Sequence, residues 1–431
     1  MNRIIVSPNR RFLMREDGAP FFYLADTAWE LFHRLTEDAA EHYLTTRASQ
    51  GYTVLQVMVL EEHDGLDVPS ATGHTALIDH DPTRPNEPYF AHIDRIVKRA
   101  NELGLVIAMF PTWGDKWNKG WGKGPEIFTP KNARVYAKWL ATRYRDADII
   151  WVLGGDRSVD NDRHRDIMRA MAEGLREGDG GAHLVTFHPT GGQRSAQYFH
   201  NEPWLDFNMA QTGHNRNSPN YRVMEADYAL QPPKPCLDGE PGYEAHFAGF
   251  NLANGYLNDF DARRAAYWAV FSGAMGHTYG CHSIWQFWDG VRQPVNFPYQ
   301  TWREALELPG GRQMRHLRAL IESVPFFTRR PAGEIILNQP GEEHRRMVAT
   351  SDGTRGESDT SCILVYYPFA DLAARLDLSR LRAPTATGTW LNPRSGERLA
   401  PAFEIQRNIE VHIQPPIEKS ALDWVLIISV E

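Results

Sequence analysis

Cysteine is scarce in this 431-residue sequence, and an excess of positive charge and long apolar runs are missing from it. The three cysteines, Cys236, Cys281 and Cys362, are odd in number and far apart, which excludes a disulfide framework and a Cys-x-x-Cys metal site. The formal net charge of −8 argues against nucleic-acid binding, which needs a basic face for phosphates. No apolar run approaches the roughly 20 residues of a membrane span, and the N-terminus lacks the apolar core of a signal peptide. We therefore expect a cytoplasmic protein, or a periplasmic or secreted one if a leader has been removed, with no nucleic-acid or membrane partner. The sequence indicates no oligomeric state.

Several catalytic motifs are missing as well. No G-x-G-x-x-G follows the first expected strand, so a doubly wound nucleotide-binding fold is disfavoured. No H-x-H pair, H-E-x-x-H or G-x-S-x-G occurs, although the chain carries 17 histidines. Histidines near the expected strand ends stand singly, which suits hydrogen bonding to sugar hydroxyls or to the core better than metal binding: His188, His214, His277 and His282. The sequence predicts no cofactor and no metal, and a metal-dependent hydrolase is the least favoured alternative.

What the sequence does contain is an alternation of short apolar strands with helices. After two short strands around SPNRR, eight strands are expected in the segments 21–26, 54–60, 105–113, 148–156, 183–189, 206–214, 235–241 and 277–287. Helices are expected from residue 36 and over 91–103, 132–143, 162–175 and 313–322. This alternation predicts an α/β fold, a (β/α)8 TIM barrel with an N-terminal β-hairpin over residues 1–325. Later strand-like segments, separated by Pro, Gly and Asn turns, predict a small all-β sandwich domain over residues 326–431.

The carboxyl ends of the barrel strands are where chemistry is expected, because their side chains surround one pocket. The residues at these ends are rich in carboxylates and aromatics: Asp26, Glu61, Glu62, Trp113, Asp115, Asp156, His188, Gln211, His214, Glu240, Tyr279 and Trp285. Asp156 ends the fourth strand and Glu240 the seventh, so we expect their side chains to face each other across the barrel mouth. Two facing carboxyl groups are what glycosidic cleavage requires, one to protonate the leaving oxygen and one to attack or to activate water. Each acid alone is as readily a turn residue, and Asp238 competes for the role of Glu240.

Tryptophan is abundant, with 13 residues, and flat indoles suit both a core and the faces of sugar rings. Trp113, Trp117 and Trp121 lie in the polar, glycine-rich segment WGDKWNKGWGKG, which we expect to form a sugar-stacking wall. Trp285 and Trp288 in SIWQFWDG fit either interpretation equally well. The cations nearest these motifs are interpreted as ordinary solvated charges: Arg157, Lys116 and Lys119.

Five ordered motifs resemble one known family. LADTAW (24–29), WVLGGD (151–156), AQTGH (210–214), DGEPGYE (238–244) and YGCHSIWQFWDG (279–290) are similar to the motif series of the DUF4038 barrels, the apiosidase-like glycoside hydrolases of family 140 and their relatives. TGTWLNPRSGE (387–397) and DWVLII (423–428) resemble the β module that follows that barrel. The module is named for collagen binding, which we do not take as its function here.

The resemblance implies an O-glycoside hydrolase with Asp156 as general acid/base and Glu240 as nucleophile. By the same matching, Asp26, Trp29, Gln211, His214 and Tyr279 would bind the sugar, with His188, Trp113 and Trp285 beside them. The implied substrate is a plant-derived oligosaccharide, of the pectic, apiose-containing kind. Many related barrels carry Glu after Asn on the fourth strand, whereas this chain carries an Asp; we favour retention over inversion. The alternative from another class is a non-catalytic carbohydrate- or protein-binding barrel.

Overall fold

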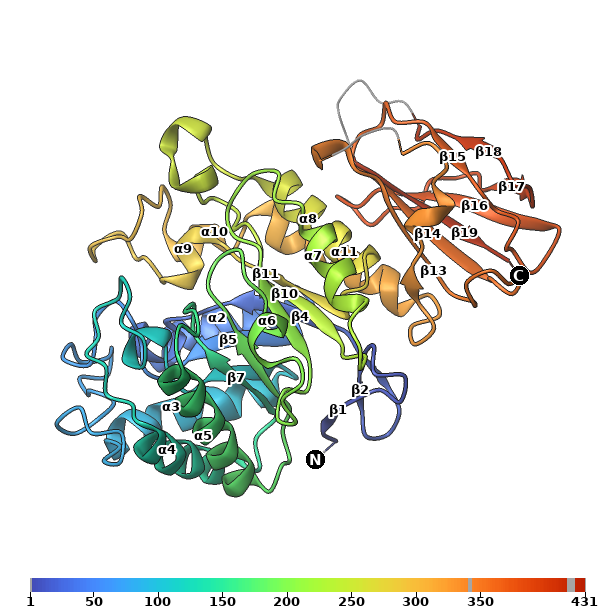
Figure 1. Cartoon of the computed structure of the whole chain (residues 1–431). Coiled ribbons are helices and arrows are strands. Elements are labelled where there is room, and N and C mark those ends of the chain that lie inside the picture. Colours follow the sequence, from blue (N-terminus) through green and yellow to red (C-terminus); the bar gives the residue numbers. More distant parts are fainter. Residues whose placement is uncertain (1, 340–342, 417–422, 431) are drawn as a thin grey trace.

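The computed structural model describes residues 2–339, 343–416 and 423–430. Figure 1 shows a larger α/β body followed by a smaller β body. The chain opens with an antiparallel sheet of β1 (Ile4–Val6), β2 (Leu13–Arg15) and β3 (Pro20–Phe21). This sheet contains the expected hairpin, and Phe12 between its strands packs on Phe326, with ring centroids 5.4 Å apart.

Eight parallel strands build the barrel, one in each expected segment. They are β4 (Tyr23–Thr27), β5 (Val54–Met58), β6 (Val106–Phe110), β7 (Ile149–Gly154), β8 (Val185–His188), β9 (Asn208–Gln211), β10 (Cys236–Glu240) and β11 (Gly276–Tyr279). A continuous curled sheet runs in the order β11-β4-β5-β6-β7-β8, and β9 pairs with β10. All eight strands are almost entirely buried, which explains why they read as apolar runs rather than as alternating patterns. The predicted (β/α)8 class is confirmed.

The ring is looser on either side of the β9–β10 pair. The segment 192–195 returns along β9, with the Gly192 amide donating to the Gln211 carbonyl and the Ser195 amide to the Met209 carbonyl. Between β10 and β11, the Met275 amide donates to the Cys236 carbonyl. On both sides of the β9–β10 pair, isolated hydrogen bonds therefore take the place of the regular ladders of hydrogen bonds that join the other neighbouring strands.

Helices cover the outside of the ring: α1 (Leu31–Arg34), α2 (Glu37–Ser49), α3 (Glu87–Glu102), α4 (Pro130–Tyr144), α5 (Asp162–Asp179), α6 (Ala196–Phe199), α7 (Asn220–Tyr228), α8 (Asp259–Phe271), α9 (His282–Trp285), α10 (Trp302–Ala305) and α11 (Pro309–Glu322). Side-chain caps begin several of them, as at Thr36, where the hydroxyl accepts from the Ala39 amide. Helix α3 begins four residues before its expected start, because Pro88 is tolerated in the first turn, where no backbone donor is needed. The expected last strand, 277–287, is corrected: it ends at Tyr279 and the chain turns into α9.

The C-terminal body is antiparallel, as predicted. One sheet has the order β12 (Arg330–Pro331), β13 (Val348–Ser351), β14 (Cys362–Tyr367), β19 (Trp424–Ser429), β16 (Thr385–Leu391) and β17 (Phe403–Gln406). The second pairs β15 (Ala374–Leu376) with β18 (Val411–Ile413). The expected domain boundary after residue 325 falls between α11 and β12.

A buried ion pair joins the two bodies. Nε and Nη2 of Arg263, on α8, donate to the carboxylate of Asp423, just before β19, over 3.1 and 3.0 Å. Beside it, the rings of Tyr267 and Tyr366 stack with centroids 4.9 Å apart. The β body is therefore fixed to the barrel through α8.

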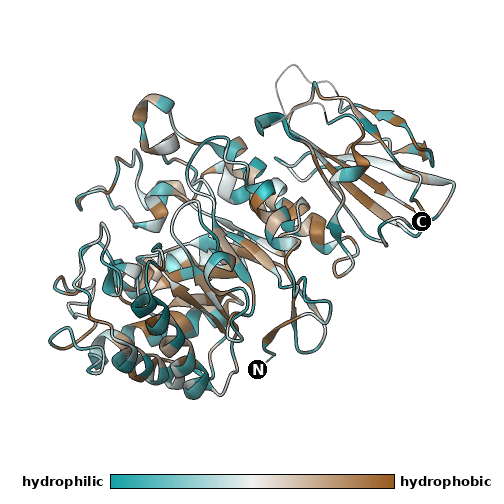
Figure 2. Ribbon diagram, in the orientation of Figure 1, coloured by the Kyte–Doolittle hydropathy of each residue, from teal (hydrophilic) through white to brown (hydrophobic). Residues whose placement is uncertain are grey.

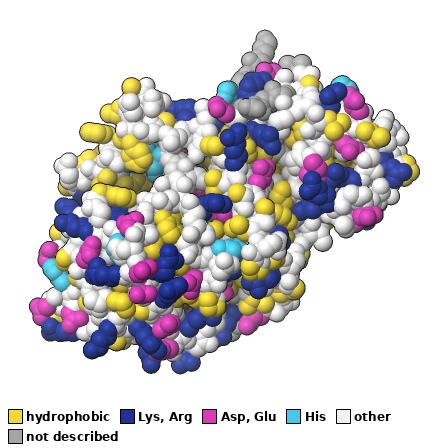
Figure 3. All heavy atoms as spheres, in the orientation of Figure 1, with side chains coloured by type: hydrophobic (Ala, Val, Ile, Leu, Met, Phe, Trp, Pro, Cys, Tyr) yellow, Lys and Arg dark blue, Asp and Glu magenta, His cyan; other side chains and the backbone are white. Residues whose placement is uncertain are grey.

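The distribution of hydrophobic and hydrophilic residues follows the arrangement of strands and helices. Hydrophobic residues are concentrated on the strands of both bodies, while the outer faces of the helices are hydrophilic (Figure 2). Positive and negative side chains are interspersed over the face shown in Figure 3. Across the described residues, no helix has the length and apolar character needed to cross a bilayer.

Candidate active site

A cavity of about 540 Å³ opens at the carboxyl ends of the barrel strands. The two predicted catalytic carboxyls, Asp156 and Glu240, both line it. Five of the predicted sugar-binding residues line it as well: Trp29, Trp113, Gln211, His214 and Trp285. The fold therefore brings most of the predicted site together from six different strands or strand-end loops.

The backbone before Asp156 adopts an unusual conformation. Gly154, Gly155 and Asp156 have φ angles of 96°, 83° and 59°, in the left-handed region that glycine tolerates. A Cβ on Gly154 would lie 2.2 Å from the His188 carbonyl oxygen, and one on Gly155 would lie 2.6 Å from the Gly114 nitrogen. Both glycines are thus required by the turn, which places a non-glycine residue at positive φ at the cavity wall. Strain of this kind is concentrated at functional sites.

Asp156 is held in conditions that favour its protonated form. Its side chain is 20% exposed, and Oδ2 lies 3.5 Å from Nη1 of Arg157. Burial raises the pKa of Asp156 well above its usual value, and the negative charge of Glu240 raises it further. Arg157 and a hydrogen bond with Gln211 act in the opposite direction but are outweighed. Asp156 is therefore suited to donate a proton.

Glu240 is held in the opposite state. Its Oε2 lies 3.1 Å from Nε2 of His188, and its Oε1 lies 3.3 Å from Nε2 of His214. Burial acts to raise the pKa of Glu240, but the two imidazoles outweigh it and hold the pKa well below the usual range. The pKa values of two carboxyls in one cavity are thus shifted in opposite directions, the arrangement that separates an acid from an ionised partner.

Asp238, the competitor for the Glu240 role, lies elsewhere. Its Oδ2 accepts from Oγ1 of Thr212 (2.8 Å) and from Nδ2 of Asn220 on α7 (2.9 Å), so its side chain points towards the helix layer. The β10–β9 register shifts between Asp238 and Glu240, and this irregularity lets two acids two residues apart take different directions. Asp238 is not among the residues that line the cavity.

Aromatic side chains form much of the cavity wall. The rings of Trp29 and Trp113 lie 4.9 Å apart between centroids. Trp121 covers Arg157, with the guanidinium carbon 4.0 Å from the ring centroid, and remains 68% exposed. The expected wall of three indoles is corrected, because Trp117 is fully buried and donates from Nε1 to the Gly154 carbonyl. Trp288 is outside the cavity lining and donates to the Arg292 carbonyl.

Three predicted sugar-binding residues do not line the cavity. Asp26 is buried and accepts from Nε of Arg47 and the hydroxyl of Tyr43. Tyr279 is buried and donates to Oε2 of Glu244. His188 acts on Glu240 rather than on the cavity surface. Their strand-end positions suggested sugar contacts, but their side chains lie against other polar side chains of the barrel instead.

The interpretation of the nearby cations as solvated charges is also corrected. Arg157 is 1% exposed, and its Nη2 donates to Oε1 of Glu62 over 2.7 Å. Lys116 is fully buried and donates to Asp115 over 2.8 Å. Lys119 is exposed, as expected.

Some cavity residues were outside the predicted set: Glu62, His63, Lys123, Tyr243, His246, Phe250 and others. The sequence identified Glu62 as a strand-end acid but not as a site residue. Tyr243 and His246 could have been found by their position, because they follow Glu240 in the chain by only three and six residues. Lys123 and Phe250 lie on long loops, where no local pattern indicates the direction of a side chain.

Comparison with known proteins places both bodies of the chain in known families. The sequence model of the family described as "Apiosidase-like, catalytic domain" matches residues 7–328. The model described as "Putative collagen-binding domain of a collagenase" matches residues 331–429. A search of curated proteins found none that matches this chain.

Solved structures give the same result. One described as a glycoside hydrolase is 33% identical, with a TM-score of 0.88 over 99% of this chain and 97% of its own. A glycoside hydrolase family 5 protein from Bacteroides vulgatus ATCC 8482 is 32% identical, with a TM-score of 0.88 over 99% of this chain and 93% of its own. A GH5_18 protein from Streptomyces cattleya, solved with Manβ1-4GlcNAc, shares the fold at 14% identity, with a TM-score of 0.51 over 71% of this chain and 82% of its own.

Proposed function

Because this chain belongs to the apiosidase-like family and is a glycosidase, we propose that it cleaves O-glycosidic bonds with retention, using Asp156 as general acid/base and Glu240 as nucleophile. The observation that carries the proposal is the placement of two carboxyl groups in one cavity, where two imidazoles contact Glu240 and lower its pKa, while burial and the charge of Glu240 raise the pKa of Asp156. Retaining and inverting glycosidases both need one protonated and one ionised carboxyl group at the start of the cycle, and the azide experiment below tests retention.

The first step uses both carboxyls together. Glu240, held ionised by two imidazoles, attacks the anomeric carbon, while the Asp156 carboxyl donates its proton to the leaving glycosidic oxygen. The bond between the anomeric carbon and that oxygen breaks, and a glycosyl ester forms on Glu240.

The second step follows from the electrostatics of the first. Once Glu240 is esterified, its negative charge is gone, and the Coulomb effect that raised the pKa of Asp156 disappears. Asp156, now a carboxylate, takes a proton from water, whose oxygen attacks the anomeric carbon and releases Glu240. Asp156 acts as the base in this step because it gave up its proton in the first step, and the lost charge of Glu240 lowers its pKa towards the ionised form.

The cavity wall supports a carbohydrate as the substrate. Trp29, Trp113 and Trp285 line the cavity together with the two carboxyls, and indole rings suit the apolar sides of sugar rings. Together with the family, this favours a plant-derived oligosaccharide, of the pectic, apiose-containing kind. Lys123, in the cavity lining, offers a positive charge for an acidic unit of such a fragment.

The test is turnover of aryl glycosides and pectic oligosaccharides by wild type, Asp156→Asn and Glu240→Gln, with Asp166→Asn as a control. Asp166 is a carboxylate on the outer face of α5, with its side chain 56% exposed. We expect both cavity variants to lose activity by at least about a thousandfold, and the control to retain it. Azide should rescue Glu240→Ala with an activated aryl glycoside and yield a glycosyl azide of inverted configuration. Wild-type rates in Glu240→Gln would refute the mechanism, and unchanged glycan binding with no turnover by wild type would favour the non-catalytic alternative.

A further inference from the structure

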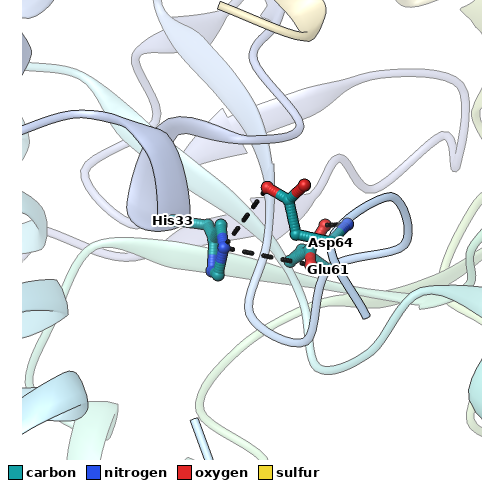
Figure 4. Close-up of side chains that lie close together, drawn as sticks. All are labelled: His33, Glu61 and Asp64. Atoms are coloured by element: carbon teal, nitrogen blue, oxygen red, sulfur yellow. Dashed lines mark hydrogen bonds and ion pairs between the residues drawn. The ribbon is translucent and has the colours of Figure 1, made fainter. Parts of the chain in front are cut away.

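A second cluster of ionisable side chains lies behind the cavity wall, where α1 meets the segment after β5 (Figure 4). Nε2 of His33 lies 3.5 Å from Oδ2 of Asp64 and 3.9 Å from Oε1 of Glu61. All three residues offer ligand atoms within 4.8 Å of one another. We propose that His33, Glu61 and Asp64 bind one divalent cation of the zinc or manganese kind.

Two of the three ligand atoms have no other partner. Oε1 of Glu61 and Nε2 of His33 accept or donate no hydrogen bond within the described structure, although their side chains are only 2% and 5% exposed. Buried polar atoms are rarely left in this state. The separations of 3.5 and 3.9 Å exceed hydrogen-bond length. Ligands each about 2.0–2.2 Å from a metal lie roughly 3–3.6 Å apart, so a small closure around an ion would complete the site.

The charge balance of the cluster also favours a cation. Besides Glu61 and Asp64, the cluster includes Glu30, which is fully buried with neither carboxylate oxygen hydrogen-bonded within the described structure. Arg34 is the nearest guanidinium, with Nε 3.4 Å from Oδ2 of Asp64 and 3.7 Å from Oε2 of Glu30. One guanidinium beside three carboxyl groups supplies less positive charge than their ionised forms would need, and a divalent ion would make up the difference.

The identity of the ligands narrows the choice of ion. The imidazole nitrogen of His33 favours transition metals such as zinc, and the carboxylate oxygens suit manganese. Calcium and magnesium prefer sites made of oxygen ligands alone, so this mixed ligand set selects against them. The side chain of Asp64 is 28% exposed, which offers a route for entry from solvent. None of the three ligands lines the cavity, so the ion would take no part in bond cleavage.

The site is placed to hold the cavity wall. Oε2 of Glu61 accepts from the Asp64 amide over 3.0 Å, which ties the turn between them, while Oε1 faces His33. The two residues within that turn, Glu62 and His63, both line the cavity. A bound ion would therefore fix the segment from which Glu62 contacts Arg157.

The experiment measures binding and stability in the full chain without substrate, so it is independent of the proposed catalytic mechanism. Protein treated with chelator and dialysed is titrated calorimetrically with Zn²⁺, Mn²⁺ and Ca²⁺, and thermal unfolding is followed with each ion. We expect one Zn²⁺ or Mn²⁺ per chain, a higher unfolding midpoint with either ion, and at least tenfold weaker binding of Ca²⁺.

The variants His33→Gln and Asp64→Asn should weaken Zn²⁺ binding at least tenfold and abolish the rise in midpoint. Asp64→Asn is the safer variant for folding, because this side chain is partly exposed. The matched control is His80→Gln, which removes an imidazole 2.8 Å from a carboxylate, that of Asp67, on the surface. Its binding should equal that of wild type. No binding by wild type, equal binding by Asp64→Asn, or binding of Ca²⁺ alone would each overturn the proposal; the first would indicate carboxyls that share a proton instead.

Discussion

Replacing His214 with Gln should move the acidic limb of the pH–rate profile to higher pH. Nε2 of His214 lies 3.3 Å from Oε1 of Glu240, and both side chains are 7% exposed. The interaction is one of two that keep the pKa of Glu240 well below its usual range. In wild type, Glu240 therefore stays ionised into acidic solution, and the loss of one imidazole raises its pKa.

The size of the shift follows from the kind of contact. A hydrogen bond to a charged group contributes about 1.5–3 kcal/mol, and one pKa unit corresponds to about 1.4 kcal/mol. The acidic limb of kcat/KM should accordingly rise by about 1–2 pH units in His214→Gln. The double variant with His188→Gln should move it further, because the second imidazole, 3.1 Å from Oε2, is then lost as well.

The assay is kcat/KM for an aryl glycoside from alkaline pH down to the lowest pH at which the protein stays folded, because the wild-type acidic limb lies well below the usual range of a glutamate. The alkaline limb, set by Asp156, should not move, because Glu240 remains ionised at neutral pH and its charge still acts on Asp156. His412→Gln, at a 71% exposed position on β18, serves as the control for loss of a histidine. An acidic limb that stays in place in both His214→Gln and the double variant would refute the reasoning.

Three further results are expected. Asp423→Asn should destabilise the protein by about 3–5 kcal/mol in urea unfolding, because the buried Arg263 keeps only Asp259 as a carboxylate partner and Arg394 also loses its ion pair. Asp371→Asn, at a 69% exposed carboxylate beside Arg345, should change stability by less than about 0.5 kcal/mol. Trp121→Ala should raise KM for an oligosaccharide severalfold and leave kcat and the unfolding midpoint nearly unchanged, because the indole is 68% exposed at the cavity rim. A fall in kcat with unchanged KM would contradict a role of Trp121 in substrate binding. Gly154→Ala should lower the free energy of unfolding by at least about 2 kcal/mol more than Gly192→Ala, because both glycines have positive φ but only a Cβ at position 154 would meet backbone, 2.2 Å away. Equal denaturation midpoints of the two variants would show that the turn after β7 relaxes freely.

The strands of the barrel were predictable, and so were the two carboxyls. Each strand is buried on both faces, so each is an apolar run that ends abruptly, and the residue at its end can be counted along the sequence. Asp156 and Glu240 were found in this way, as were Gln211 and His214, and the cavity contains all four.

Counting to the end of a strand did not predict the direction in which a side chain points. Asp26 ends a strand as Asp156 does, yet its carboxylate turns to Arg47 and Tyr43 beneath the cavity. Trp117 and Trp121 lie four residues apart in one polar loop, but only one of them is buried, because the loop folds over Gly154. The direction of these side chains depends on the polar groups that other helices and strands place beside them, and the local sequence does not contain this information.

The sequence by itself determined the order of strands and helices, the change to an antiparallel β domain and the strand ends at which catalysis was expected, because burial and turn chemistry act on neighbouring residues. Only the tertiary structure decided the protonation of Asp156 and Glu240 and the meeting of His33 with Glu61 and Asp64. Those properties arise from charges that approach within a few ångströms of one another where neighbouring strands of the ring end, between segments separated in the chain.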